Sequence, residues 1–397
     1  MTSSRYDVVV VGGGINGVGV AQAAAAAGHS VLLLEKKGLA AGTSSRSSKL
    51  IHGGLRYLES WEFSLVREGL MERALLLRLA PDLVKLKPFY IPIFSYTRRR
   101  PWLMGAGLSL YALLGKLEKA VRFEKVPRRR WDQLDGLVTD DLDAVFCYRD
   151  AQTDDALLTA AVWNSAQGLG AELAMPAEFM GAELVNDGSA VSYRRDGQEF
   201  TCQARVLVNA GGPWVNRVID RIVPAPWRRP VDLVQGTHII VRGQVECGIY
   251  YVEVRRDGRA VFIMPWKGET LVGTTETRFR GDVDQVSPLR TEKSYLLRVL
   301  NRYFPHYRAT DPGVVLDAFA GLRVLPAGPG HAFHRSRETI LDVDRENNRE
   351  RPRVLSIYGG KLTAWRATAA KVMARIEGAL PGRRPVADTR ALPLTPP

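Results

Sequence analysis

The stretch YDVVVVGGGINGVGVAQAAAAAGHSVLLLE, residues 6–35, decides the fold. Its opening run of four valines predicts a buried strand. Gly12, Gly14 and Gly17 follow at G-x-G-x-x-G spacing, an alanine-rich run predicts a helix, and SVLLLE predicts a second strand that ends in Glu35. Strand, glycines, helix, strand and acidic residue in this order are typical of a dinucleotide-binding βαβ unit, whereas the glycine spacing alone is a weak signal.

Each glycine of this unit, and its final glutamate, has a separate physical task. Gly12 permits a tight turn after the strand, and Gly14 lets the backbone approach a pyrophosphate at the N-terminus of the helix. Gly17 allows the helix to pack closely on the strand, and Glu35 can accept hydrogen bonds from ribose hydroxyls. The alternative, a glycine-rich turn without a ligand, is disfavoured because all parts of the unit occur in order.

Two later segments favour FAD over NAD. LVNAGGPWV, residues 207–215, predicts a buried strand that ends in a glycine pair. VLSIYGGKLTAWRATAAKVMARI, residues 354–376, predicts a strand, a break at a second glycine pair and an amphipathic helix. NAD-dependent dehydrogenases do not usually return to the nucleotide site near their far end, whereas flavoproteins with two dinucleotide-binding domains do. Their last helix directs its N-terminus at the flavin pyrimidine ring, where its dipole can stabilise the reduced anion.

The stretch GTSSRSSKLIHGGLRYLES, residues 42–60, fits no ordinary secondary-structure pattern. It follows the second predicted strand, so in a doubly wound fold it lies at the carboxyl edge of the sheet, beside the cofactor. Its small hydroxyl residues can bind phosphate and ribitol without filling space, and Gly53-Gly54 lets the backbone pass against a flat ring. Arg56 and Tyr57 then lie just past the ring as donors. A solvated serine-rich loop is the alternative.

The composition is that of a globular protein with one large or two medium domains. The 397 residues are 46% hydrophobic and 24% charged, and the net charge is +13. The three cysteines are far apart, so we expect no disulfide framework, no metal site and a reducing compartment. The arginines are spread along the chain without a recognition-helix pattern, so we do not expect nucleic-acid binding. No apolar run is long enough to span a membrane.

Six motifs together resemble the FAD-dependent glycerol-3-phosphate dehydrogenases, the respiratory, quinone-linked enzymes. They are VVVVGGGINGVGVAQAAAAAG, TSSRSSKLIHGGLRYLE, NAGGPWV, FIMPWKGETLVGTTE, AGLRVL and SIYGGKLTAWR. The resemblance runs from about residue 5 to about residue 380. It implies an α/β fold in which a doubly wound parallel sheet binds FAD, of the type with two dinucleotide-binding domains, together with an antiparallel-sheet substrate domain.

The resemblance also implies roles for particular residues. Arg56 and Tyr57 in GGLRY, Arg323 in AGLRVL and Lys361 in GGKLT match positions that contact the substrate, and Arg337 in HRSRETILDV matches another pocket arginine. A dianionic phosphate favours several cations, which agrees with this set. We expect FAD to be contacted by Gly12, Gly14, Ile15, Asn16, Gly17, Glu35, Thr43, Ser44, Ser48, Lys49, Leu50, His52, Gly53, Gly54, Phe179, Ala210, Gly211, Gly360, Lys361, Leu362 and Thr363.

His238 in QGTHIIV matches a family histidine near the reacting carbon and is our candidate for the catalytic base. In the implied reaction, the base takes the hydroxyl proton of sn-glycerol 3-phosphate while a hydride passes from C2 to the flavin, which gives dihydroxyacetone phosphate. Arg323 could stabilise the alkoxide as it forms. A structural role is the alternative for His238, because it alternates with apolar neighbours, and a surface ion pair is the alternative for Arg337.

Several functional choices stay open at this point. The reduced flavin must pass its electrons to ubiquinone or another quinone, or to oxygen. The chain could instead be an FAD-dependent oxidase or dehydrogenase of another small anion, such as an amino acid or a 2-hydroxy acid, or a flavin-binding protein without turnover. The set of four cations argues against a substrate without phosphate.

We expect a discontinuous cofactor domain. The boundaries are 1–85, 150–222 and 331–380 for the FAD-binding domain, 86–149 and 223–330 for the substrate domain, and 381–397 for an irregular tail. Family members usually continue into a carboxyl-terminal helical domain, and this sequence stops where that domain would begin, so we expect either a short natural variant or a truncated chain. A homodimer is possible.

Segment 87–125 combines apolar and basic residues in a way that is typical of an interfacial helix. The apolar positions that could share a face are Trp102, Leu103, Leu110, Leu113, Leu114, Leu117 and Val121. The flanking cations are Arg98, Arg99, Arg100, Lys116, Lys119 and Arg122. We therefore expect a cytoplasmic protein that binds peripherally to the inner face of the cytoplasmic membrane. The alternative is an amphipathic helix packed on the protein's own core.

Overall fold

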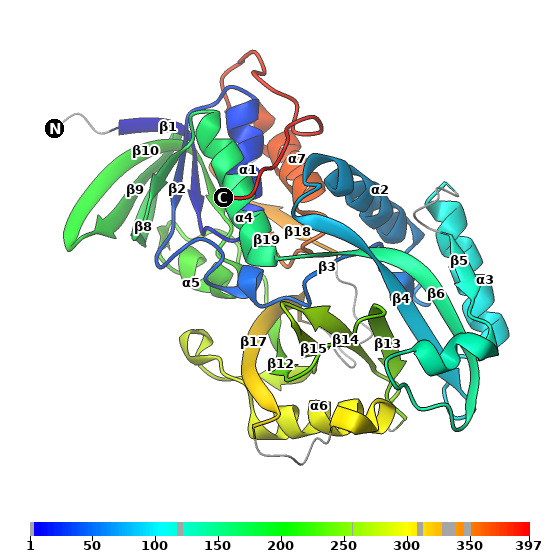
Figure 1. The fold of residues 1–397 in the computed structure, drawn as a ribbon. Helices are drawn as coiled ribbons and strands as arrows, with labels where there is room; N and C mark the ends of the chain where they lie inside the picture. Colours follow the sequence, from blue (N-terminus) through cyan, green and yellow to red (C-terminus); the bar gives the residue numbers. More distant parts are fainter. Residues whose placement is uncertain (1–3, 117–121, 256, 308–312, 328–337, 345–350) are drawn as a thin grey trace.

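The computed structural model describes residues 4–116, 122–255, 257–307, 313–327, 338–344 and 351–397. Within them, the chain forms two β-sheets with helices packed on both, and Figure 1 shows the first sheet above the second. The α-helices are α1 (Ile15–Ala26), α2 (Phe63–Leu79), α3 (Pro101–Leu114), α4 (Asp155–Gly168), α5 (Val215–Ile219), α6 (Arg290–Tyr303) and α7 (Trp365–Ile376).

The first sheet is built around the amino-terminal strand β1. Its main path runs β11-β8-β9-β10-β1-β2-β7, with β19 beside β10 and β18 beside β19. The strands are β1 (Ser4–Val11), β2 (Val31–Leu34), β7 (Glu172–Ala174), β8 (Glu178–Val185), β9 (Gly188–Arg195), β10 (Gln198–Asn209), β11 (Ile222–Val223), β18 (Ile340–Val343) and β19 (Val354–Tyr358). Strands β19, β10, β1, β2 and β7 run parallel to their neighbours in that order, as a doubly wound fold requires.

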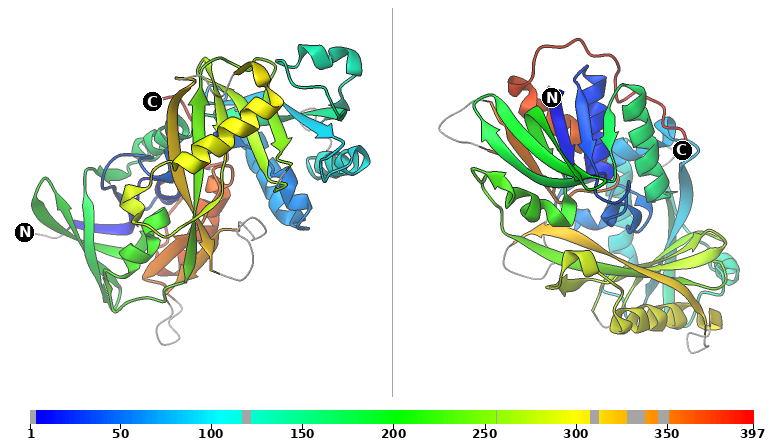
Figure 2. Two further views of the ribbon diagram at one scale, coloured as in Figure 1. Left: turned by 90° about the horizontal axis from the view of Figure 1, so that it is seen from below. Right: turned by 90° about the vertical axis from the view of Figure 1, so that its left-hand side faces the viewer.

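Helices α1, α4 and α7 pack together on one side of this sheet. The small side chains of α1 make this possible, because a Cβ on Gly19 would lie 2.7 Å from the Trp365 ring. The valines of β1 and the leucines of β2 are buried on both faces of the sheet. Alternate residues pack against these helices, and the residues between them pack on the opposite face. Figure 2 shows the helix layer and the sheet edge-on. The strand–glycine–helix–strand unit predicted from residues 6–35 is confirmed as β1, α1 and β2.

The second sheet is mainly antiparallel and lies below the first in Figure 1. Its path runs β16-β12-β15-β14-β13-β4-β6-β3, with β17 beside β12 and β5 beside β6. The strands are β3 (Leu50–Ile51), β4 (Val84–Phe94), β5 (Phe123–Lys125), β6 (Leu142–Thr153), β12 (Val231–Val241), β13 (Ile249–Glu253), β14 (Ala260–Trp266), β15 (Glu269–Gly273), β16 (Thr277–Phe279) and β17 (Val315–Pro326). Helix α6 covers the face of this sheet that points away from the first sheet (Figures 1 and 2).

The predicted fold class, a doubly wound α/β domain joined to an antiparallel sheet, is therefore confirmed. The domain boundaries stay a prediction, and short β3 and the start of β4 pair with β6 in the second sheet. Residues 380–397 contain no helix or strand. They lie against the end of α2, where the Leu394 amide donates to the Leu79 carbonyl and the Leu394 side chain is buried.

Candidate functional site

A cavity of about 540 Å³ lies between the two sheets. Residues at the ends of β1 and β2 and at the start of α1 line one side, and residues of β12 and β17 line the other. Residues from 41–53 and 359–364 complete the lining. Distant segments thus meet at the carboxyl ends of the parallel strands, which is where doubly wound folds bind their ligands.

The turn between β1 and α1 requires glycine for steric reasons. Gly12 has a φ of +110°, and a Cβ there would lie 2.7 Å from the Ala210 carbonyl oxygen. A Cβ on Gly17 would lie 1.9 Å from the carbonyl oxygen of Gly12, so helix and strand are in close contact. A Cβ on Gly14 would have only Ser44 Oγ within 4 Å, at 3.1 Å, and Gly14 lines the cavity. The turn therefore leaves an open cradle at the N-terminus of α1.

Two side chains fix this cradle. Glu35 accepts hydrogen bonds from the amides of Gly13, at 2.6 Å, and Lys37, at 2.8 Å. The Glu35 carboxylate also lines the cavity, and its remaining lone pairs can accept from ribose hydroxyls. Ser44 Oγ accepts from the Ile15 amide at 2.9 Å, so one of the first amides of α1 is satisfied by the hydroxyl-rich loop.

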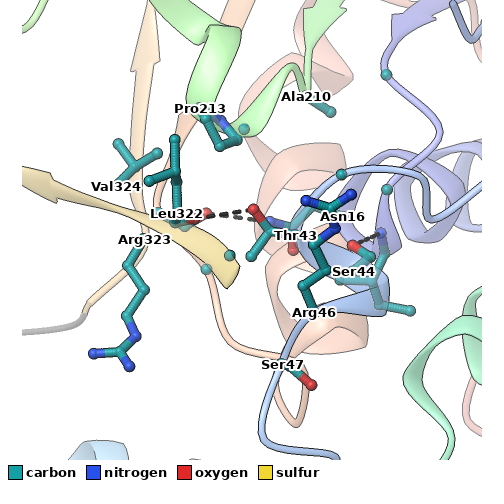
Figure 3. Close-up of a pocket in the computed structure, with 18 of the residues that line it drawn as sticks. Asn16, Thr43, Ser44, Arg46, Ser47, Ala210, Pro213, Leu322, Arg323 and Val324 are labelled. Atoms are coloured by element: carbon teal, nitrogen blue, oxygen red, sulfur yellow. Dashed lines mark hydrogen bonds between the residues drawn. The ribbon is translucent and has the colours of Figure 1, made fainter. Parts of the chain in front are cut away.

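The hydroxyl-rich loop is also tied to the second sheet. Thr43 Oγ1 donates to the Leu322 carbonyl of β17 at 2.9 Å, and Ser48 Oγ is hydrogen-bonded to His238 Nε2 of β12 at 3.0 Å. Figure 3 shows Thr43 bonded to Leu322, and Ser44 pointing the other way, toward the start of α1. The loop therefore closes the space between the two sheets, and some hydroxyls that we expected on phosphate and ribitol already have protein partners.

The structure brings most of the predicted cofactor residues to this cavity. Those that line it are Gly12, Gly14, Ile15, Asn16, Glu35, Thr43, Ser44, Ser48, Leu50, His52, Gly53, Phe179, Ala210, Gly211, Gly360, Lys361, Leu362 and Thr363. Gly17, Lys49 and Gly54 are not among the described lining residues. Gly17 packs on Gly12, and Gly54 has a φ of +78° with the Tyr57 ring against it. Both glycines therefore allow the backbone its course and do not contact a ligand in the cavity.

Lys49 lies in a buried ion pair instead. Its Nζ atom is 2.5 Å from Asp155 Oδ1, and both residues are buried. Asp155, the first residue of α4, also accepts from the amide and the hydroxyl of Ser47. Burial raises the pKa of Asp155, and the Lys49 charge opposes that shift. This pair anchors the hydroxyl-rich loop to α4, and sequence reasoning missed Asp155 because the pairing spans two distant segments.

Tyr57, Arg323 and Lys361, which we expected to contact the substrate, all line the cavity. Lys361 Nζ lies 4.0 Å from the centroid of the Tyr57 ring. Arg323 Nη1 donates to Glu276 Oε1 at 2.7 Å, and Nη2 donates to Thr274 Oγ1 at 3.1 Å. Arg56 is not among the described lining residues, and Arg337 lies outside the described residues.

His238 is buried in β12 and lines the cavity beside Arg323. Its ring stacks on Phe319, with 5.0 Å between the centroids and 16° between the planes. Burial and the positive charges of Arg323 and Lys49 lower the pKa of His238 to about 3. The imidazole is therefore neutral at neutral pH and able to accept a proton, although its basicity is low.

Sequence reasoning also missed the partners of Arg323. Glu276 and Thr274 belong to GETLVGTTETRF, residues 268–279, within the segment 223–330 that we expected to form the antiparallel-sheet domain. The structure divides it into β15 and β16, with residues 274–276 between them. The run of four polar residues TTET, 274–277, was the available signal, because it interrupts the apolar alternation of a strand.

Three comparisons with known proteins agree with this geometry. The sequence model of the FAD dependent oxidoreductase family, DAO, matches residues 7–371. D-erythritol 1-phosphate dehydrogenase from Brucella abortus is 38% identical over 94% of this chain and 74% of its own length. Glycerol-3-phosphate dehydrogenase from Pseudomonas aeruginosa is 39% identical over 94% of this chain and 72% of its own. The FAD-complexed structure of glycerol-3-phosphate dehydrogenase from Bacillus halodurans is 25% identical, with a TM-score of 0.75, and covers 99% of this chain and 68% of its own.

The residues of the cavity fit FAD. The open glycine cradle and the amides at the N-terminus of α1 suit a pyrophosphate, and the Glu35 carboxylate suits ribose hydroxyls. Residues 359–364, which directly precede α7, line another part of the cavity, as the resemblance implies for the isoalloxazine end. FAD is thus the cofactor, and the chain belongs to the FAD-dependent glycerol-3-phosphate dehydrogenase family within the FAD dependent oxidoreductases.

Proposed function

We propose that this protein oxidises a phosphorylated polyol, with sn-glycerol 3-phosphate as substrate and dihydroxyacetone phosphate as product. The observation that carries the proposal is the pair of cations Arg323 and Lys361, which line the same cavity as the cofactor cradle. Fixed cations of this kind suit the phosphate and the developing charge of such a substrate. The relatives named for glycerol 3-phosphate and D-erythritol 1-phosphate support the same substrate class.

The chain's residues bind and orient the substrate. When bound, FAD accepts the hydride from the secondary carbon. Lys361, packed on the Tyr57 ring, supplies a positive charge for the phosphate. Glu276 and Thr274 fix the Arg323 guanidinium before the substrate arrives, so it can stabilise the oxygen on which negative charge develops.

His238 is the proposed acceptor of the hydroxyl proton. Its low pKa is caused in part by the positive charge of Arg323 and Lys49. A dianionic phosphate bound at Lys361, in the same cavity as Arg323, would offset this charge and raise the imidazole pKa toward its ordinary value. The substrate would thus increase the basicity of the group that deprotonates it, and Ser48, which is bonded to Nε2, would fix the orientation of the ring.

A second candidate substrate is D-erythritol 1-phosphate, because the Brucella abortus relative bears that name. Anaerobic titration of the oxidised flavoprotein separates the possibilities. We expect the visible absorbance of the oxidised flavin to bleach with sn-glycerol 3-phosphate. Faster bleaching with D-erythritol 1-phosphate would favour the second candidate. Bleaching with an amino acid or a 2-hydroxy acid would assign another anion, and no bleaching with any of them would indicate flavin binding without turnover.

We also propose that a membrane quinone takes the electrons and that α3 binds the membrane surface at the inner face of the cytoplasmic membrane. One face of α3, with Met104 and Leu108, is buried in the protein. The opposite face leaves Trp102 74% and Leu113 61% exposed. The exposed cations Arg98, Arg100 and Lys116 flank it.

This surface has the composition of an interfacial helix. Figure 1 places α3 at the edge of the molecule that lies away from β8 and β9. Leu117, Lys119 and Val121 lie outside the described residues. Each helix in the described part of the chain is too short or too polar to cross a membrane. Contact would therefore be made through the α3 surface, which we define as Trp102, Leu103 and Leu113.

A further inference from the structure

Glu292 is a buried carboxylate on α6, behind the second sheet as seen from the cavity. Its side chain accepts five hydrogen bonds from two strand segments and from the start of its own helix. The donors are Gln235 Nε2 at 2.7 Å, Thr237 Oγ1 at 2.6 Å, Thr275 Oγ1 at 2.9 Å, Thr277 Oγ1 at 2.6 Å and the Leu289 amide at 3.1 Å. We propose that Glu292 is a positioning residue, which fixes from behind the strands that carry His238 and the partners of Arg323.

The first of these segments is β12. Gln235 and Thr237 point toward α6 and donate to Glu292 Oε2. Gly236 and His238 alternate with them, so they face the other side of the strand, and both line the cavity. A displacement of Thr237 would therefore move the adjacent His238 relative to Ser48 and to the cofactor pocket.

The second segment joins β15 to β16. Thr275 and Thr277 donate to Glu292 Oε1. Thr274 and Glu276 alternate with them and bond the guanidinium of Arg323. The same carboxylate thus fixes the backbone on which the Arg323 partners are placed.

The two segments are also bonded to each other at this point. The Thr237 amide donates to Thr275 Oγ1 at 2.9 Å, and the Thr275 amide donates to the Thr237 carbonyl at 3.2 Å. Burial acts to raise the pKa of Glu292, but the hydrogen bonds from Thr237 and its other partners outweigh it and lower that pKa. Glu292 is therefore an ionised group that only accepts hydrogen bonds, and five donors depend on it.

The inference rests on the proposed function, and its test is the variant Glu292→Gln in the FAD-loaded protein. The glutamine side chain has an NH2 group, a donor, in place of one carboxylate oxygen. The hydroxyls that donate to that oxygen in wild type would then face another donor and lose their hydrogen bonds. We expect kcat for sn-glycerol 3-phosphate to fall about tenfold or more, with KM within about threefold of wild type. In a background of Arg323→Ala, the same change should have less effect on kcat, because the part of the positioning that acts through Arg323 is then already lost.

Asp135→Asn is the matched control. Asp135 also accepts several hydrogen bonds beside the second sheet, from the Cys247 amide and from Tyr250 Oη of β13. It does not line the cavity. We expect this variant to be less stable with kcat unchanged. If Glu292→Gln does not fold, Thr277→Val removes one donor to Glu292 and should lower kcat in the same direction. An unchanged kcat in the folded variant, or effects that add in the double mutant, would overturn the inference.

Hydrogen–deuterium exchange gives a readout that does not depend on turnover. Glu292→Gln should speed exchange in peptides that cover 235–241 and 273–279, and Asp135→Asn should leave those peptides unchanged. Unchanged exchange there with Glu292→Gln would count against Glu292. A wild-type protein that does not oxidise any polyol phosphate would instead contradict the proposed function, and the exchange data would still decide the positioning role.

Discussion

The ammonium group of Lys361 lies 4.0 Å from the centroid of the Tyr57 ring. The two residues follow separate glycine pairs, and Gly54, Gly359 and Gly360 all have positive φ angles. The glycines thus turn two remote segments toward each other at one end of the cavity. A cation on an aromatic face in a partly dry site is stabilised by about 0.5–2 kcal/mol. The ring therefore limits the positions that the ammonium can take before an anion binds.

Lys361→Met should weaken the use of phosphorylated polyols with little effect on cofactor content. The loss of one charged hydrogen bond to phosphate corresponds to about 1.5–3 kcal/mol, or roughly a 10- to 100-fold fall in kcat/KM. Tyr57→Leu should lower kcat/KM less, because the charge remains. Steady-state kinetics and the ratio of flavin to protein absorbance provide the measurement. A Lys361→Met protein with wild-type kcat/KM would remove this lysine from the substrate site.

Gly14→Val should abolish retention of FAD. The added side chain would enter the open cradle at the N-terminus of α1, where the pyrophosphate is expected. Gly38→Ala is the control, because a Cβ at Gly38 would have no atom within 4 Å and Gly38 does not line the cavity. The flavin content after gel filtration measures the result. A yellow Gly14→Val protein would place the pyrophosphate elsewhere.

The cofactor half of the fold could be predicted because its signals are local. Gly12 takes a positive φ in the turn itself, and Gly17 packs on the Gly12 carbonyl five residues away, so the glycine spacing alone indicates both positions. The hydroxyl-rich loop was placed correctly beside the cofactor cavity, since its position follows from the end of β2. These predictions needed no knowledge of how distant strands pair.

The polar network behind the site could not be predicted for the opposite reason. The structural roles of Glu292 and Asp155 depend on hydrogen-bond partners from distant segments of the chain. Nothing near either residue in the sequence identifies those partners. Lys49 was expected to contact FAD, but its ammonium bonds Asp155, 106 positions along the chain. The division of GETLVGTTETRF into two strands depends in the same way on Arg323 and α6.

Stability should fall as the pH falls below about 6.5, in part because of His238. The unfolded imidazole has its ordinary pKa, and the folded one has a pKa lowered to about 3. The unfolded state therefore binds a proton first, so His238 makes the free energy of unfolding decrease between pH 6.5 and 3. Between pH 6.5 and 5 this amounts to roughly 2 kcal/mol.

Urea unfolding at several pH values, with saturating FAD, measures this effect. The free energy of unfolding of wild type should decrease more steeply from pH 6.5 to 5 than that of His238→Gln. The difference between the two proteins is needed because burial also lowers the pKa of His29. Equal slopes for both proteins would show that His238 is not held neutral in the folded state.

Asp155→Asn should destabilise the protein strongly, because it leaves the buried ammonium of Lys49 without its carboxylate. Removal of one partner of a buried ion pair costs on the order of 3–5 kcal/mol. Glu199→Gln breaks the exposed pair with Arg194 and serves as the control, for which we expect little change. The midpoints of urea unfolding give the comparison. Similar midpoints for both variants would mean that Lys49 finds another acceptor.

Binding of the α3 surface to lipid is the last prediction. The double change Trp102→Gln and Leu113→Gln removes the two most exposed large apolar side chains of α3. We expect weaker co-sedimentation with vesicles of anionic lipid and lower quinone reductase activity in their presence, because both apolar contact and proximity to a dissolved quinone are reduced. Bleaching of the flavin by sn-glycerol 3-phosphate without vesicles should be unchanged, because neither residue lines the cavity.

Salt and a matched variant distinguish a lipid surface from other causes. High salt should weaken vesicle binding by wild type, because Arg98, Arg100 and Lys116 are exposed around α3 and their attraction to anionic headgroups is screened. Trp227→Gln changes an equally exposed tryptophan far from α3 in the sequence and should bind vesicles as wild type does. If the double variant sedimented like wild type, or if wild type stayed in the supernatant at low salt, α3 would not be the membrane contact. The oxidation of the polyol phosphate would be unaffected by that result, since its residues lie in the cavity between the sheets.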